Sequence, residues 1–319
     1  MRDKELEIIH LYTEKRMSLS DIGKLFNCKA QRIHGVLIKN NVERRPLNKS
    51  HTRVSKNEKF FSEINTQEKA YILGFLYADG CNYSKRNRTL LTLQENDKEI
   101  LNKIKECIEY TGDLIYVCKN PPHQNQWTLS LSSKEISEDL NKLGCVPRKS
   151  LILTFPTEEQ VPSHLIHHFI RGYFDGDGCL SMNKNTQSYN LSFVGTFEFL
   201  SGVLNTLHQD IGISLKKICK INHKQDRNTY LLSISGRNQL KKVLNWLYKD
   251  STIYLDRKYT KFKQFEQYHQ SFFLNQLQRK DFSKNKMCKN LDCYNVTYSN
   301  KDVCKSCHYN KKIIIDVQP

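Results

Sequence analysis

Two stretches of the chain repeat one pattern, and this repeat constrains the fold more than any other feature. YILGFLYADG covers residues 71–80 and FIRGYFDGDG covers residues 169–178. Each is apolar over several helical turns, carries a glycine near its middle and ends on Asp-Gly. Asp79 and Asp177 are 98 residues apart, and similar elements follow both, which indicates an internal duplication.

The predicted elements recur in the same order after both Asp-Gly pairs. Two strand-like runs precede a helical pattern, and two further strand-like runs precede a second helical pattern. Each unit is therefore αββαββα, which predicts an α+β fold of two pseudo-symmetric half-domains. We expect the first half over residues 63–156 and the second over residues 157–275.

Small residues on the two repeated helices predict that these helices pack closely. Gly74 and Ala78 are four residues apart, as are Gly172 and Gly176, so each pair lies on one helical face. A face without bulky side chains lets two helices approach with their backbones nearly in contact. We therefore expect the repeated helices to pack against each other.

That packing would bring two carboxylates together. Asp79 and Asp177 would lie side by side at helix C-termini, where the helix dipole and mutual repulsion both disfavour negative charge. A divalent cation relieves both problems, and hard ions such as Mg²⁺ take oxygen ligands. The repeat thus predicts a metal site. Gly80 and Gly178, which follow the aspartates, are expected to be left-handed helix caps.

LGFLYADG and RGYFDGDG resemble the two motifs of single-chain LAGLIDADG homing endonucleases, and the resemblance covers roughly residues 66–265. It implies that the motif helices form the central interface and that Asp79 and Asp177 bind the catalytic Mg²⁺. Tyr77 departs from the acidic residue that the family usually has there, whereas Asp175 keeps it. The resemblance implies that this position is not the principal metal ligand.

The resemblance also implies a catalytic lysine near the end of each half. VPRKSLILTFP and YLDRKYTKF are the corresponding segments and nominate Lys149 and Lys258. Ordinary surface lysines are the alternative, and Arg148 or Arg257 could take the same role.

The implied reaction is hydrolysis of both DNA strands across the minor groove. Metals held by two carboxylates can activate water and support the leaving oxygen, while lysines neutralise developing charge. Two alternatives use the same scaffold: a non-cleaving DNA-binding transcription regulator, which the retention of both aspartates disfavours, and an RNA maturase, which would prefer folded intron RNA. Cations on or beside the strands are candidate DNA contacts, namely Arg86, Arg88, Lys184, Lys216, Lys220, Lys224 and Arg227.

Residues 1–48 contain three helical patterns, the second with Ser20 as its expected N-cap. Ile33 and Leu37 lie one turn apart in the third. The pattern is typical of a helix-turn-helix DNA-binding domain, and a small helical bundle with a charged face is the alternative. The second motif helix would present Lys29, Gln31, Arg32 and His34 to DNA. Residues 49–62 lack periodicity and predict a basic linker.

Four cysteines near the C-terminus predict a structural zinc site over residues 284–312. Two close pairs of thiolates suit tetrahedral Zn²⁺, and so short a segment has little other core. Free buried cysteines are the alternative, and His308 competes with Cys307 as the fourth ligand. The predicted ligands are Cys288, Cys293, Cys304 and Cys307. His164, His167 and His168 are instead expected on the second motif helix as packing or surface residues.

The net charge of +17 favours a polyanionic partner, either nucleic acid or an anionic membrane, and residues 1–60 and 276–319 together carry +12 of it. No apolar stretch is long enough to span a bilayer, and the first residues lack the apolar core of a signal peptide. We therefore expect an intracellular monomer that binds a long site in double-stranded DNA, in the cytoplasm of a bacterial or phage-infected host.

Overall fold

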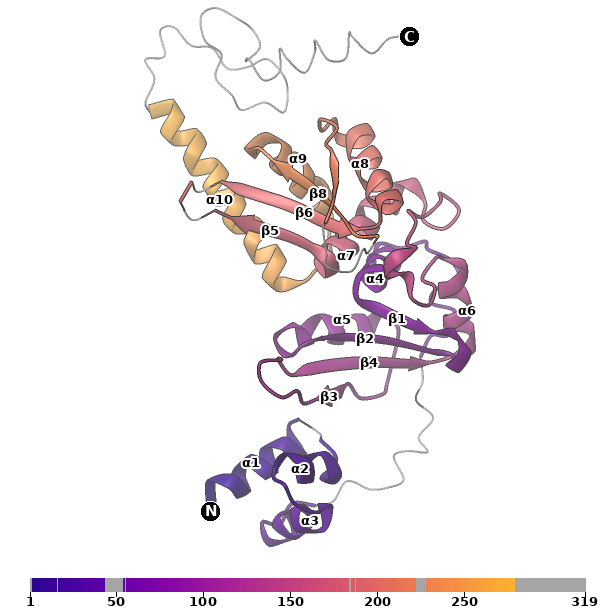
Figure 1. Cartoon of the computed structure of the whole chain (residues 1–319), viewed down its shortest axis with the longest axis vertical. Coiled ribbons are helices and arrows are strands. Elements are labelled where there is room, and N and C mark those ends of the chain that lie inside the picture. Colours follow the sequence, from indigo (N-terminus) through magenta and orange to yellow (C-terminus); the bar gives the residue numbers. More distant parts are fainter. Residues whose placement is uncertain are drawn as a thin grey trace, which may run out of the picture. The chain divides into compact units, whose positions relative to one another are not determined.

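The computed structural model describes residues 2–15, 17–43, 54, 56–183, 185–186, 188–221 and 228–278. The chain forms two compact units that interleave in sequence (Figure 1). The first unit comprises Met1–Glu63 and Asp79–Lys142, and the second comprises Ile64–Ala78 and Leu143–Pro319.

The first unit contains a four-stranded antiparallel sheet of order β1-β2-β4-β3. Its strands are β1 (Gly80–Tyr83), β2 (Arg88–Gln94), β3 (Ile115–Val117) and β4 (Gln126–Ser132). The helices α5 (Lys98–Cys107) and α6 (Lys134–Lys142) cover one face, where α5 contacts β2 and β4 and α6 contacts β1 and β2 (Figure 1). Short turns η2 (Ser84–Arg86) and η3 (Glu95–Asp97) follow β1 and β2.

The second unit repeats this sheet with the order β5-β6-β8-β7. Its strands are β5 (Gly178–Met182), β6 (Tyr189–Gly195), β7 (Ile218–Lys220) and β8 (Tyr230–Ser235). The helices α8 (Phe197–Ile211) and α9 (Arg237–Tyr248) contact β6 and β8, and α10 (Asp256–Gln278) contacts β5 and α9. The predicted α+β class and its pseudo-symmetric halves are therefore confirmed.

The face of each sheet that the helices leave open carries polar residues beside some apolar ones, among them Leu90 in the first unit and Val194 in the second. Along β2, the buried residues run from Thr89 to Leu93 at every second position, so Arg88, Thr92 and Gln94 point the other way. The opposite strand contributes Thr128, whose hydroxyl lies 2.9 Å from that of Thr92. In the second unit, Asn190 and Ser192 of β6 pair with Ser235 and Ser233 of β8 on the corresponding face.

The N-terminal residues form the three predicted helices, α1 (Arg2–Thr13), α2 (Leu19–Leu25) and α3 (Ala30–Lys39). Their shared core consists of Ile8, Tyr12, Met17, Ile22, Ile33 and Leu37. The predicted N-cap at Ser20 is wrong, because α2 begins at Leu19 and Ser18 is its N-cap. Ser18 has an extended backbone, and its hydroxyl accepts a hydrogen bond from the Asp21 N–H at 3.1 Å.

The end of the predicted linker is packed. Phe60 and Phe61 are buried, and the Asn57 N–H donates to the Ile108 carbonyl at 2.8 Å. Among the residues that the structure describes, no helix has both the length and the apolar character needed to cross a membrane.

Candidate functional site

The helices α4 (Gln67–Asp79) and α7 (Ile166–Asp177) meet backbone to backbone. A Cβ atom on Gly74 would lie 1.9 Å from the Phe169 carbonyl oxygen, and one on Gly172 would lie 2.0 Å from the Tyr71 carbonyl oxygen. The rings of Tyr77 and Phe169 meet edge to face, with centroids 4.9 Å apart. The predicted close approach of the two motif helices at their glycines is confirmed.

Each motif helix ends on its aspartate and passes directly into a strand. Asp79 is followed by β1 and Asp177 by β5, and both aspartates are exposed. The left-handed caps predicted at Gly80 and Gly178 are wrong, because Gly178 is extended, with φ −83° and ψ 162°, and Gly80 already belongs to β1. Gly178 is required by space: a Cβ there would lie 2.6 Å from the carbonyl oxygen of Phe174.

The two predicted lysines are buried against the last turns of these helices. Lys149 lies in η4 (Lys149–Leu151), and its Nζ donates to the Ala78 carbonyl at 3.4 Å. Lys258 lies in α10, and its Nζ donates to the carbonyls of Gly176 at 3.3 Å and Gly178 at 2.6 Å. Ala78 and Gly176 occupy the same place in the repeat, directly before the motif aspartate.

The two lysines differ in burial from the arginines that precede them in the sequence. Lys149 is 6% exposed and Lys258 is 4% exposed, whereas Arg148 and Arg257 both lie on the surface. An ammonium group stabilises the C-terminus of a helix, because the last carbonyl groups there have no backbone N–H of the helix as a partner.

Asp177 and the two lysines share one electrostatic environment. Although Asp177 is exposed as a whole residue, the protein around its carboxyl removes part of the solvent and raises the pKa of Asp177, while the charges of Lys149 and then Lys258 act in the opposite direction. An ionised Asp177 is therefore more costly than an ordinary surface aspartate, and a cation close to it would stabilise the ionised form.

Asp175 is buried among hydrogen-bond donors. It is fully buried and accepts hydrogen bonds from the Tyr71 hydroxyl at 2.8 Å, the Tyr248 hydroxyl at 3.2 Å and the Leu255 N–H at 2.8 Å. Burial raises the pKa of Asp175, which Lys258 opposes. At the equivalent position of the first motif, the Tyr77 hydroxyl donates to a backbone carbonyl instead. Both side chains anchor the last turn of a motif helix.

The histidines of this region divide between packing and surface positions. His168 is buried on α7, with its Nδ1 2.6 Å from Nη1 of Arg171, and the pKa of His168 is lowered to about 3 by burial and by Arg171. His167 stacks beside His168 with its pKa lowered to about 4, chiefly by burial. His164 is exposed in η5 (Ser163–Leu165), so its predicted place on the motif helix is wrong.

The predicted DNA contacts of the first unit lie at its surface. Lys29 precedes α3 as its N-cap residue and is exposed, as are Gln31 and Arg32, while His34 is half-buried. Arg88 lies on the open face of the sheet, where its Nε donates to the Ser130 hydroxyl at 2.9 Å. Arg86 is exposed in η2.

The second unit places its predicted contacts less uniformly. Lys216 is half-buried before β7. Lys220 pairs with Tyr230. Tyr230 is two residues before the buried Leu232 and therefore lies on the same face of β8, so Lys220 also lies on the helix-covered face of the sheet. Lys184, Lys224 and Arg227 lie outside the described residues.

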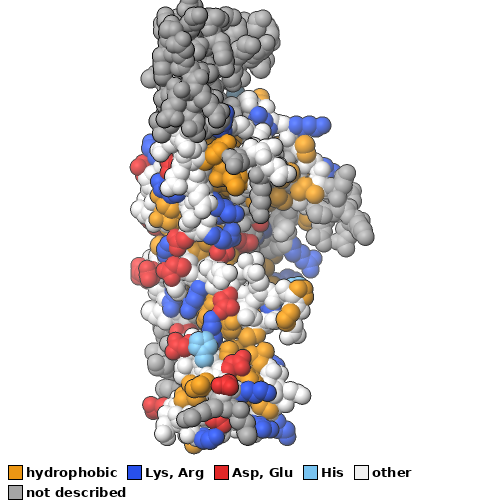
Figure 2. Space-filling model, turned by 90° about the vertical axis from the view of Figure 1, so that its left-hand side faces the viewer, with side chains coloured by type: hydrophobic (Ala, Val, Ile, Leu, Met, Phe, Trp, Pro, Cys, Tyr) orange, Lys and Arg blue, Asp and Glu red, His pale blue; other side chains and the backbone are white. Residues whose placement is uncertain are grey.

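The open sheet faces also carry uncharged polar residues that a search for cations misses. Thr92, Gln94 and Thr128 lie on this face in the first unit, and Ser192 and Ser233 in the second. The alternation of buried and accessible residues in strands such as RTLLTLQ predicts which polar residues lie on the open face. In the view of Figure 2, acidic and basic side chains are interspersed over the described surface.

The predicted zinc ligands Cys288, Cys293, Cys304 and Cys307, together with His308, lie outside the described residues. Within the described part of the chain, no group of three or more His, Cys, Asp or Glu side chains could hold a metal ion.

The model of the LAGLIDADG-like domain family matches residues 165–246, from the last residue of η5 into α9. Among curated proteins, a probable translation initiation factor IF-2 of Methanocaldococcus jannaschii is 24% identical over 188 residues. This alignment covers 55% of the chain but only 14% of the relative, so the chain is similar to one segment of a much longer protein.

Solved structures with similarity include LAGLIDADG homing endonucleases and meganucleases. The homing endonuclease I-GzeII in complex with its DNA target is 14% identical, with 67% of this chain and 92% of that chain covered and a TM-score of 0.44. The meganuclease I-AabMI bound to uncleaved DNA is 11% identical, with 65% and 91% covered and a TM-score of 0.42.

Proposed function

We propose that this chain is a site-specific endonuclease that hydrolyses double-stranded DNA with divalent metal ions, as homing endonucleases do. One observation carries the proposal. In both repeats a buried lysine donates a hydrogen bond to the carbonyl directly before the motif aspartate, Lys149 to Ala78 and Lys258 to Gly176. One fixed cation beside each motif aspartate would be suited to stabilising charge on the phosphates of two strands. The family match to residues 165–246 supports the same assignment.

The donor set fits a hard divalent cation of the Mg²⁺ type. Asp79 and Asp177 are the proposed ligands, and no larger cluster of ligand side chains exists among the described residues. Mg²⁺ is commonly held by one or two carboxylates, with water and substrate phosphates as its other ligands. Catalytic zinc, by contrast, takes three protein ligands. When bound, such an ion supplies an activated water and support for the leaving 3′ oxygen.

The protein's own contribution is fixed charge. Because hydrogen bonds to backbone carbonyls hold their ammonium groups, Lys149 and Lys258 can stabilise charge that develops on the phosphate without moving into place. Asp175 supports this arrangement as a positioning residue. It accepts from the Leu255 N–H, and the Leu255 carbonyl accepts from the Lys258 N–H at 2.9 Å, so α7 and the start of α10 are tied together.

The remaining surfaces are proposed to bind DNA and metal. The open polar faces of the two sheets would contact a long site, and residues 1–48 would add a helix-turn-helix through α3. The cysteines of residues 284–312 would hold one structural Zn²⁺. We further propose that the protein acts on the locus of its own gene, as a monomer.

The proposal is tested with Asp79→Asn and Asp177→Asn. Each keeps the shape of the side chain and removes a proposed ligand, so cleavage in Mg²⁺ should fall by orders of magnitude while DNA binding in Ca²⁺ persists. The substrate is DNA spanning the insertion locus of the gene, and both strands are assayed. Near wild-type cutting by either variant would refute the site. Binding without cutting by the unmodified chain would instead indicate the DNA-binding regulator.

A further inference from the structure

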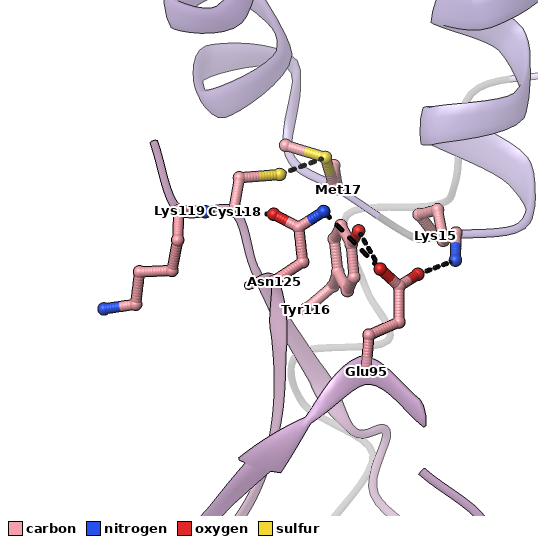
Figure 3. A network of polar contacts seen from close by, with 7 residues as sticks. All are labelled: Lys15, Met17, Glu95, Tyr116, Cys118, Lys119 and Asn125. Carbon is pink, nitrogen blue, oxygen red and sulfur yellow. Dashed lines mark hydrogen bonds and ion pairs between the residues drawn. The ribbon is translucent and has the colours of Figure 1, made fainter. Parts of the chain in front are cut away.

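One carboxylate in the first unit collects donors from three separate segments (Figure 3). Glu95 follows β2 and forms an ion pair with Lys15, which lies just after α1. Its Oε2 accepts from the Tyr116 hydroxyl at 3.1 Å and from the Asn125 side chain at 3.5 Å. Glu95 therefore joins the N-terminal helices to the edge strand β3 and to the segment before β4.

Apolar contacts lie beside this network. Met17 belongs to the core of the three N-terminal helices, and its Sδ lies 3.5 Å from Sγ of Cys118 (Figure 3). Tyr116 and Cys118 pack against the same core. Because β3 is the terminal strand of its sheet, the N-terminal helices contact the sheet at that end.

The contact leaves the third helix accessible. Its residues come from the connection between α1 and α2, namely Lys15 and Met17. Lys29, Gln31 and Arg32 of the proposed DNA-contacting surface remain exposed. The docking contacts and the proposed DNA contacts therefore come from different segments of the N-terminal helices.

The duplication provides an internal comparison. In the second unit the residue that follows β6 is Thr196, which caps α8 by accepting from the Phe199 N–H at 3.2 Å. The middle residue of the edge strand β7 is Cys219. Neither the carboxylate nor the phenol of the first unit is repeated, so the docking chemistry belongs to one half only.

We propose that Glu95 organises a docking surface on β3 that holds the N-terminal helical domain against the first half-domain, with α3 free to contact DNA. The domain then extends the DNA-contacting surface on one side of the target only. This rests on the proposed function, because both surfaces must bind DNA for the extension to be seen. The kind of partner that fits the surface is thus this chain's own N-terminal domain, positioned by Glu95.

Docking can be tested without DNA. A Met17→Cys variant of the full chain places a thiol next to Cys118, and mild oxidation should give that disulfide in most molecules, identified by peptide mass mapping. Gln31→Cys, on the exposed face of α3, is the matched control and should not trap Cys118. Adding Glu95→Gln to Met17→Cys should slow trapping several-fold. Equal trapping by Gln31→Cys, or none by a Met17→Cys chain that circular dichroism shows to be folded, would overturn the docking.

A second measurement needs no change in a buried residue. Carbodiimide couples an ammonium and a carboxylate that are in contact, so the unmodified chain should yield a Lys15–Glu95 cross-linked peptide. Glu95→Gln should abolish this peptide and leave other cross-links unchanged. If Lys15 couples as readily to other surface carboxylates as to Glu95, the docking is refuted even when the Met17→Cys chain does not fold.

The functional part is tested by footprinting the Met17→Cys chain before and after oxidation. We expect both forms to protect the same base pairs, with protection extending further on one side of the cleavage site. If the additional protection on one side is lost only in the oxidised form, the docked domain cannot contact DNA, and the inference is refuted. Failure of both forms to bind any DNA would instead remove the proposed function, while the trapping result would stand.

Discussion

Replacing Gly74 with alanine should destabilise the protein through the contact between the two motif helices. The added Cβ would lie 1.9 Å from the Phe169 carbonyl oxygen and 2.8 Å from the carbonyl carbon. Ordinary contact begins near 3.4 Å, so the backbones would have to separate by about 1.5 Å, the difference between 3.4 and 1.9 Å. The obstacle is backbone and not the end of a flexible side chain, so it cannot rotate away.

The magnitude is the balance of two terms. Alanine in a helix interior is favoured over glycine by about 1 kcal/mol, whereas overpacking a well-packed core costs about 1–3 kcal/mol and occasionally more. Because both backbones are fixed by their own helical hydrogen bonds, we expect the upper end, with a net loss of about 2 kcal/mol. That corresponds to a fall in Tm of about 4–8 °C for a unit of this size.

Thermal unfolding monitored by calorimetry measures this change, and Gly35→Ala is the matched control. Gly35 lies inside α3 with nothing within 4 Å of its would-be Cβ, so alanine there should raise stability by up to about 1 kcal/mol. Opposite signs for the two substitutions are the expected result. A Gly74→Ala chain that melts at or above the unmodified temperature would refute backbone contact between the motif helices.

Asp175→Asn should lower the free energy of unfolding by about 1–3 kcal/mol, because three donors face that buried carboxylate, while Asp177→Asn should melt near the unmodified temperature. The pKa of His168 is lowered from 6.5 to about 3, so the unfolded chain binds a proton in this window that the folded chain does not. Stability contributed by neutral His168 should therefore be full above about pH 6.5 and fall by at most about 2 kcal/mol at pH 5, less where solvent screens the ring, a slope that His168→Asn should flatten in denaturant titrations. Deleting residues 1–48 should shorten the DNA footprint and reduce the salt dependence of binding, and an unchanged slope would exclude phosphate contacts by this segment. Elemental analysis should find about one Zn²⁺ per chain, lost in Cys293→Ser, and a zinc-free chain purified without chelator would contradict the site.

Local patterns in the sequence were sufficient to predict the main helices and strands and the presence of two similar half-domains. The repeat with its 98-residue spacing predicted two matching half-domains, and the two sheets indeed have the same strand order. The spacing of Gly74 and Gly172 within apolar helices predicted a close approach, because four residues return a helix to the same face. The three N-terminal helices were predictable for the same reason: helical periodicity is a local property.

Expectations about helix ends failed where a neighbour in space mattered more than the local rule. An Asp-Gly pair after a helix usually indicates a left-handed glycine. Gly178 is extended, and it is glycine because the Phe174 carbonyl occupies the space of a Cβ. Ser20 satisfied the pattern for an N-cap, but Ser18 has the extended backbone that capping requires.

The choice among basic residues was decided only by tertiary structure. The sequence left Arg148 and Arg257 as alternatives to Lys149 and Lys258, since adjacent cations are equivalent in composition and charge. Folding exposes both arginines and buries both lysines against helix-terminal carbonyls more than seventy residues away in sequence. The docking by Glu95 has the same origin, because its donors come from three segments that no local pattern relates to it. Periodicity specifies which face of an element is apolar, but the partner of a polar side chain is set by the chain that packs opposite it.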